Sequence, residues 1–138
     1  MTIKTVHYIN QFFGQIGGEE KADVPPSVVE GAVGVGLQIE ERFKGKIRIV
    51  KTIICGDNYA AENTETVSSL VLKELQEAGA GFFIAGPSFG AGRYGTACAL
   101  FCREAVKKAK IPAICAMNPV SPGVDLAKRD LYIMETAD

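Results

Sequence analysis

The sequence predicts an α/β domain with three layers, in which helices cover both faces of a mainly parallel sheet of about five strands. Short apolar runs of strand length recur along the chain, and stretches with helical periodicity separate them. This alternation is typical of right-handed crossovers between parallel strands. The apolar runs are also nearly continuous instead of alternating with polar residues, which indicates strands covered on both faces. Together these observations favour a doubly wound fold of the Rossmann or flavodoxin type.

The predicted strands are rich in β-branched and aromatic residues, which favour extended structure. They comprise residues 5–9, 47–55, 82–85, 113–117 and 131–134. After the last run only residues 135–138 follow, without a helix to cover that strand. It is therefore either an edge strand or a sign that the sequence is a piece of something longer.

Two helices are expected between the later strands. In the first, Asn63 or Thr64 caps the N-terminus, and Gly79 lies where a left-handed glycine usually ends a helix. Its apolar stripe consists of Val67, Leu70, Val71, Leu75 and Ala78. The second runs from about residue 93 to residue 110, where several lysines complement the helix dipole and Pro112 prevents continuation.

The segment between residues 14 and 43 has a weaker pattern. Pro25-Pro26 excludes a central strand there, because proline cannot donate to a sheet ladder. Several glycines weaken any helix, and only residues 37–43 have helical spacing.

Size and composition limit the function classes. With 138 residues, we expect a single domain spanning residues 1–138. The 15 basic residues are balanced by 16 acidic ones, so no basic surplus is available to attract nucleic acid. The N-terminus lacks a signal-peptide pattern, and no apolar run reaches the roughly 20 residues of a membrane span. We therefore expect a cytoplasmic protein whose four cysteines stay reduced.

Four loops are predicted at the carboxyl ends of the strands, where ligands of such folds bind. They comprise residues 10–20, 56–59, 86–95 and 118–125, and they are long and rich in glycine and polar residues. We expect a site for a substrate or an anion here. Its candidate residues are Asn10, Gln11, Asp57, Asn58, Tyr59, Ser88, Gly90, Gly92, Arg93, Tyr94 and Asn118. For residues 57–59, a capping turn of the following helix is the alternative.

The third of these loops contains GAGRYG at residues 90–95, a G-x-G-x-x-G pattern. A dinucleotide-binding turn would follow its strand directly, and an acidic residue would end the next strand. Here a Pro-Ser-Phe tripeptide intervenes, and the next strand ends in Met-Asn. An anion site of backbone amides, the Ser88 hydroxyl and Arg93 therefore explains the pattern better, with Arg93 available for a carboxylate. A tight turn with a solvated Arg93 is the structural alternative.

The other reactive side chains have ordinary structural explanations. His7, the only histidine, lies in a predicted strand and is more often a hydrogen-bonded core residue than a catalyst. Glu19-Glu20 is most simply a solvated turn, with contact to a substrate ammonium or a partner chain as the alternative. Cys98 and Cys102 share an apolar helix face without further ligands nearby, so we expect core thiols and no metal site. Cys55, at a strand's carboxyl end, is kept as a redox candidate.

Four long and unusual motifs cover much of the chain: VHYINQFFGQIGGEEKAD (6–23), ICGDNYAAEN (54–63), AGPSFGAGRYGTAC (85–98) and LYIMET (131–136). In order and spacing they resemble the N-terminal part of the selenoprotein B subunit (component B, gamma-type) of the glycine/sarcosine/betaine reductase family. The resemblance implies an N-terminal domain of a longer reductase subunit from amino-acid fermentation.

The resemblance also implies a chemistry. Component B of this family takes glycine, sarcosine or betaine, and a selenocysteine selenolate attacks the carbon that bears the nitrogen. The amine leaves, and the carboxymethyl group passes as a selenoether to a selenoprotein A-type carrier. A pyruvoyl group on a partner component B subunit activates amine substrates. The selenocysteine region lies beyond the matching part, so we expect no nucleophile and no cofactor within this chain, and no activity of the chain alone.

The substrates implied by the resemblance fit the predicted loops. All three share a carboxylate and a cationic nitrogen. Arg93 and a helix N-terminus suit the carboxylate, while Tyr59, Tyr94 and acidic side chains suit the nitrogen. Two alternatives stay open: a flavodoxin-like or nucleotide-binding domain that uses residues 90–95, and a non-catalytic module that assembles with reductase subunits.

Overall fold

The computed structural model describes residues 2–89, 92–117 and 132–135, and these form one sheet of six strands with helices on both faces. The strands are β1 (Ile3–Asn10), β2 (Ser27–Glu30), β3 (Ile47–Cys55), β4 (Phe82–Phe89), β5 (Ala113–Met117) and β6 (Tyr132–Glu135). Their order across the sheet is β2-β3-β1-β4-β5-β6. All neighbouring strands are parallel except β2, which is antiparallel to β3. The predicted mainly parallel α/β sheet is confirmed.

The strand that the sequence did not predict is β2. It begins directly after Pro25-Pro26 and pairs with β3 alone, as an edge strand. The exclusion of a central strand at this place therefore holds, but the sheet has one strand more than the apolar runs indicate. β2 is short and mostly exposed, so it carries no continuous apolar run.

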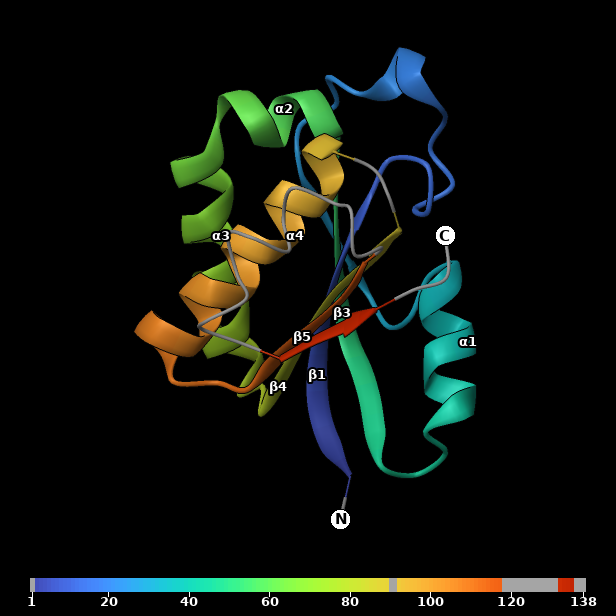
Figure 1. Ribbon diagram of the computed structural model, residues 1–138. Helices are drawn as coiled ribbons and strands as arrows, with labels where there is room; N and C mark the ends of the chain where they lie inside the picture. Colours follow the sequence, from blue (N-terminus) through green and yellow to red (C-terminus); the bar gives the residue numbers. More distant parts are fainter. Residues whose placement is uncertain (1, 90–91, 118–131, 136–138) are drawn as a thin grey trace.

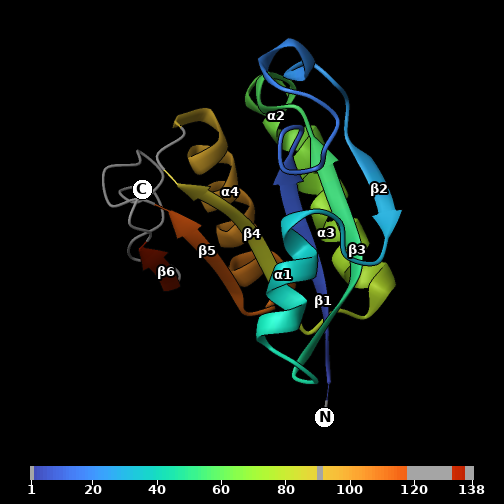
Figure 2. The same cartoon turned by 90° about the vertical axis from the view of Figure 1, so that its right-hand side faces the viewer.

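The helices form the outer layers. They are α1 (Val35–Arg42), α2 (Asp57–Glu62), α3 (Thr64–Ala78) and α4 (Gly92–Glu104), with single turns of 3₁₀ helix at η1 (Glu19–Lys21) and of π-helix at η2 (Ala105–Ala109). Figure 1 shows α3 and α4 on one face of the sheet and α1 on the other. Figure 2 looks onto the sheet from the α1 side, with the strands from β6 to β2 in the order given above. The three predicted layers are confirmed.

The ends of the long helices agree with the sequence, apart from one capping bond. Gly79 ends α3 in the left-handed conformation, with φ of 62°. Asn63 occupies the N-cap position, but its side chain makes no capping bond and instead donates to the carbonyl of Tyr59. The predicted N-cap position is therefore confirmed, but the Asn63 side chain makes its bond to the preceding α2 and not to the first amides of α3.

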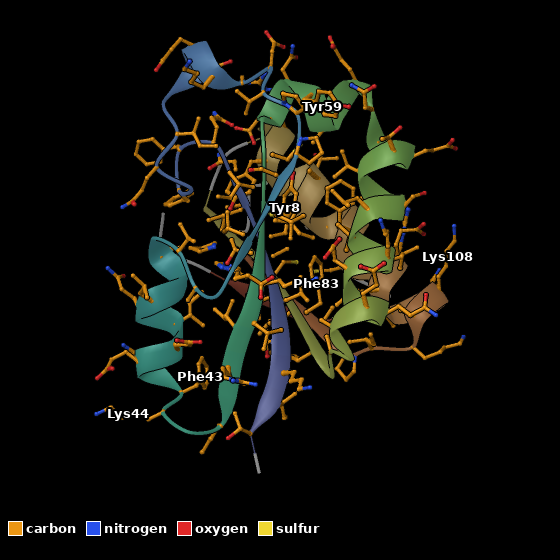
Figure 3. All side chains as sticks on the ribbon, turned by 180° about the vertical axis from the view of Figure 1, so that it is seen from behind. Tyr8, Phe43, Lys44, Tyr59, Phe83 and Lys108 are labelled. Carbon is orange, nitrogen blue, oxygen red and sulfur yellow. The ribbon has the colours of Figure 1, made fainter. Side chains whose placement is uncertain are left out.

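The main core lies between the sheet and the pair α3 and α4. Val67, Val71 and Leu75 of the predicted stripe are fully buried. Burial of each such side chain stabilises the fold by roughly 1.5–3 kcal/mol. Figure 3 shows Tyr8 and Phe83 on this side of the sheet, and both belong to the same buried cluster. Among the described residues, no helix combines the length and the hydropathy that a membrane span needs.

Candidate functional site at the switch point of the sheet

The order of the parallel strands places one reversal point in the sheet. Counted along the chain, the parallel strands lie in the order 2-1-3-4-5, which is the flavodoxin-like arrangement. The reversal falls between β1 and β4, and the loops that follow these strands leave in opposite directions at their carboxyl ends. This is where open α/β sheets bind ligands, and most of the candidate residues lie here.

Asn10, the last residue of β1, is the centre of a hydrogen-bond cluster. Its Oδ1 accepts the N–H groups of Phe12 and Phe13 at 3.1 and 3.0 Å, and its Nδ2 donates to Oδ2 of Asp57 at 3.0 Å. Gln11 Oε1 accepts the N–H of Asp57 at 3.0 Å. The three candidates Asn10, Gln11 and Asp57 are thus brought together, as predicted. Most of their hydrogen bonds are internal, so Asn10 and Gln11 chiefly hold the loop after β1 against the end of β3.

The same loop continues across the carboxyl end of β3 and caps α2. The carbonyl of Ala22 accepts the N–H groups of Asn58 and Tyr59 at 2.8 and 3.1 Å, and the carbonyl of Val24 accepts that of Gly56 at 3.0 Å. A side chain at Gly56 would clash, because its Cβ would lie 2.6 Å from the carbonyl carbon of Ala22. The first amides of α2 are therefore satisfied by the chain itself. Residues 57–59 form a capped first turn, and their amides are not available to a ligand.

Arg93 lies in the first turn of α4 and already holds a carboxylate. Its Nη2 donates to both carboxylate oxygens of Glu19, at 2.8 and 2.7 Å, and its Nη1 lies 3.5 Å from Oδ1 of Asn58. The Arg93 side chain is 40% exposed and that of Glu19 is 74% exposed. Arg93 thus pairs with a carboxylate of the chain itself, that of Glu19. Glu19 is largely exposed, as expected for a solvated turn, and its carboxylate also pairs with Arg93, while Glu20 accepts the N–H of Gly18 in its own turn.

Asp57 combines burial with an unpaired oxygen. Its side chain is almost wholly buried, and Oδ1 has no hydrogen-bond partner in the described part of the chain. Burial raises the pKa of Asp57, and the bond from Asn10 and the charge of Arg93 oppose this shift. The hydroxyl groups of Tyr8 and Tyr94 are also buried close by. A polar interior therefore lies beneath the exposed Arg93.

The remaining candidates differ in how they face solvent. Tyr94 is buried, and its ring packs against Tyr8 and Phe13, with ring centroids 6.4 and 5.9 Å away. Tyr59 is partly buried against the core, and Figure 3 shows it on α2 at the carboxyl end of the sheet. Ser88 is buried at the end of β4. Gly92 starts α4, and a Cβ added there would meet no atom of another described element within 4 Å, whereas the candidates Gly90 and Asn118 lie outside the described residues.

A hollow of about 300 Å³ adjoins Arg93. It is lined by Ala60, Ala61, Thr64, Gly92, Arg93, Thr96, Ala97 and Leu100. A second hollow of about 400 Å³ lies between α3 and α4 and shares Thr64 and Leu100 with the first. Small side chains at the start of α4 and in α2 thus leave room for a small molecule beside the guanidinium.

The cysteines do not resemble reactive thiols. All four are buried and free. Burial raises the pKa of Cys55 to about 12 and that of Cys98 and Cys102 well above the usual value. Reactive cysteines show the opposite shift, so the geometry gives no support to Cys55 as a redox residue. In the described ranges, no group of three or more histidine, cysteine or acidic side chains is placed to hold a metal.

His7 has a role that the sequence indicates only in outline. It is fully buried in β1, and its Nε2 lies 2.6 Å from the carbonyl oxygen of Gly86. This carbonyl directly follows the last β4 residue that pairs with β1, Ala85. His7 therefore holds β4 at the point where its pairing with β1 ends, ahead of the loop that leads to Arg93. Its Nδ1 has no partner in the described chain and faces α1, where a Cβ on Gly36 would lie 3.0 Å away.

Sequence comparison identifies relatives over almost the whole chain. The family model described as glycine/sarcosine/betaine reductase selenoprotein B matches residues 2–138. The glycine reductase complex component B subunit gamma of Carboxydothermus hydrogenoformans is 49% identical over 135 residues, which are 98% of this chain and 31% of the relative. The sarcosine reductase complex component B subunit beta of Peptoclostridium acidaminophilum is 41% identical over 136 residues, or 99% of this chain and 31% of the relative. The betaine reductase complex component B subunit beta of the same organism is 39% identical over 131 residues, or 95% and 30%.

The chain spans about a third of the length of the curated relatives that it matches. No solved structure matches it. The relatives are named for three different substrates, and their identities to this chain do not single out one of them.

Proposed function

Because the chain belongs to the glycine/sarcosine/betaine reductase selenoprotein B family, we propose that it is part of a component B subunit and binds the carboxylate of a small amino acid or betaine. The observation that carries this proposal is the exposed guanidinium of Arg93, which holds the Glu19 carboxylate at 2.7 Å beside a hollow of about 300 Å³. An arginine that holds a side-chain carboxylate in this place has the chemistry to hold that of a substrate.

The surroundings of Arg93 suit a substrate with both charges. Arg93 and Asp57 attract each other electrostatically, so positive and negative side chains lie near one another at the carboxyl edge. Glycine, sarcosine and betaine each carry a carboxylate and a cationic nitrogen. In this proposal the carboxylate binds Arg93 at the start of α4, and the nitrogen lies toward Asp57 and the ring of Tyr59.

We assign binding, and not the nucleophilic step, to this chain. The four cysteines are buried thiols, so none of them fits the role of the selenolate that the family resemblance implies. In our proposal residues 1–138 are an N-terminal domain of a longer cytoplasmic subunit. The selenocysteine, the pyruvoyl-containing partner subunit and the selenoprotein A-type carrier lie outside it. In the chemistry that the family resemblance implies, a selenolate outside residues 1–138 would form a carbon–selenium bond as the carbon–nitrogen bond breaks, the amine would leave, and the carboxymethyl group would stay on selenium as a selenoether until it passes to the carrier.

The proposal is tested by replacing Arg93 with alanine in the intact protein. Binding of glycine, sarcosine and betaine is measured by calorimetry. Loss of a charge-assisted hydrogen bond should weaken binding roughly ten- to a hundredfold. Arg42→Ala, at the exposed C-terminal end of α1, removes the same charge far from the hollow and should leave the affinity unchanged. Equal affinities of the Arg93→Ala variant and the parent protein would contradict the carboxylate site.

The strand order favours one second candidate. A 2-1-3-4-5 parallel sheet is also the arrangement in which flavodoxin-like proteins bind flavin at the switch point. Titration of the same protein with FMN and with NAD distinguishes the two. Saturable nucleotide binding that persists in the presence of excess glycine would favour a nucleotide site.

A further inference from the structure

The contact between Glu19 and Arg93 joins η1 to α4 across a separation of 74 residues. It occupies Nη2, one of the two terminal nitrogens of Arg93 that an external carboxylate would engage together. We propose that Glu19 is an internal competitor for the Arg93 site, so that a substrate carboxylate binds only by displacing the carboxylate of Glu19. This inference rests on the function proposed above and adds to it a residue that sets the affinity.

The geometry supports direct competition. Both oxygens of Glu19 lie within 2.8 Å of Nη2 of Arg93, so a second carboxylate cannot reach the same nitrogen at that distance. Among the described residues, Nη1 makes a long contact of 3.5 Å to Oδ1 of Asn58. A substrate carboxylate that engaged both terminal nitrogens would therefore bond Arg93 in a better geometry than Glu19 does.

The Glu19 side chain can be displaced while the backbone of residues 22–24, which caps α2, stays in place. η1 has no buried residue, and Glu19 is largely exposed. The segment around it is held by other groups, above all by the Ala22 carbonyl on the amides of Asn58 and Tyr59. The side chain of Glu19 can therefore rotate into solvent while the backbone stays in place. Because exposed ion pairs are weak, the competition should change the affinity a few-fold and not by orders of magnitude.

Competition also predicts a dependence on salt. Both side chains are exposed to solvent, so the internal pair weakens as ionic strength rises. At high KCl concentration Glu19 should occupy Arg93 less often. The affinities of the parent protein and of a variant without the Glu19 charge should then converge, even though both become weaker.

The test compares Glu19→Gln with Glu20→Gln in the intact protein. Both variants remove one negative charge from the same turn, but Glu20 contacts Gly18 and not Arg93. Binding of glycine, betaine and acetate is measured by calorimetry at low and high KCl. Glu19→Gln should tighten the binding of all three by roughly three- to sixfold at low salt. Glu20→Gln should leave the affinities unchanged.

The outcomes separate this inference from the function on which it rests. If Arg93→Ala abolishes binding but Glu19→Gln behaves like Glu20→Gln, the competition is refuted while the carboxylate site stands. If Arg93→Ala binds as the parent protein does, the proposed site itself fails. A tightening by Glu19→Gln that is as large at high salt as at low salt would also overturn the inference, because an exposed ion pair is screened.

Discussion

The buried imidazole of His7 predicts a loss of stability in mild acid. Burial lowers the pKa of His7 from 6.5 to about 4, and the bond to Gly86 only partly opposes this shift. Between these two values the unfolded chain binds a proton that the folded protein does not bind. The free energy of unfolding should therefore fall as the pH decreases from 6.5 toward 4, and the contribution of His7 should be fully present above this window.

The size of the effect follows from the shift. One pKa unit corresponds to about 1.4 kcal/mol, so the shift of the His7 pKa from 6.5 to about 4 changes the free energy of unfolding by about 3 kcal/mol in total. About 2 kcal/mol of this is lost when the pH falls to about 5. A domain with a typical stability of roughly 5–15 kcal/mol loses a substantial fraction of it in this way. The loss should appear as a lower denaturation midpoint.

The assay is urea denaturation at about pH 8 and about pH 5 for the parent protein and for His7→Gln. The glutamine amide can still donate to the carbonyl of Gly86, but it does not titrate. The difference between the two pH values should shrink by about 2 kcal/mol in the variant. Other groups such as Asp57 titrate in both proteins, so their effect cancels in the comparison. An identical pH dependence of the two proteins would refute the assignment of a neutral buried imidazole that donates from Nε2.

Three further predictions concern the loops and the thiols. Gly56→Ala should lower the free energy of unfolding, measured by urea denaturation, by about 1–3 kcal/mol because its Cβ overlaps the carbonyl of Ala22. An unchanged midpoint would mean that the backbone around Ala22 moves aside without loss of stability. Asn10→Asp should destabilise the protein more near neutral pH than in mild acid, because a second carboxylate replaces the amide that donates to Asp57; equal losses at both pH values would argue against this contact. All four thiols should resist iodoacetamide until the protein unfolds, as counted by mass spectrometry, and rapid alkylation of native Cys55 would restore it as a redox candidate.

The regular elements could be predicted because their signals are local. Continuous apolar runs mark the buried parallel strands, and the stripe from Val67 to Leu75 with Gly79 behind it marks α3. β2 has no such signal, since an exposed edge strand of four residues needs no apolar pattern. Asn63 stands at the predicted N-cap, but the donation of its amide to the Tyr59 carbonyl has no local signal in the sequence.

The site could be predicted only in part. Parallel strands bring their carboxyl ends together, so the meeting of Asn10 with Asp57 follows from topology. The partner of Arg93 does not, because Glu19 lies far away in the sequence and no local pattern links the two. The burial of Tyr94 had an available signal: it lies one helical turn before Ala97 and Cys98 and so continues the apolar face of α4.

The antiparallel strand β2 has a consequence for how this molecule meets other chains. It covers the outer edge of β3, whose backbone groups would otherwise invite a strand from another protein. β2 is itself a poor template, because it is only four residues long and follows two prolines that cannot donate hydrogen bonds. Neighbouring subunits or aggregating copies therefore cannot readily extend the sheet beyond β2, and assembly on that flank has to proceed through side chains.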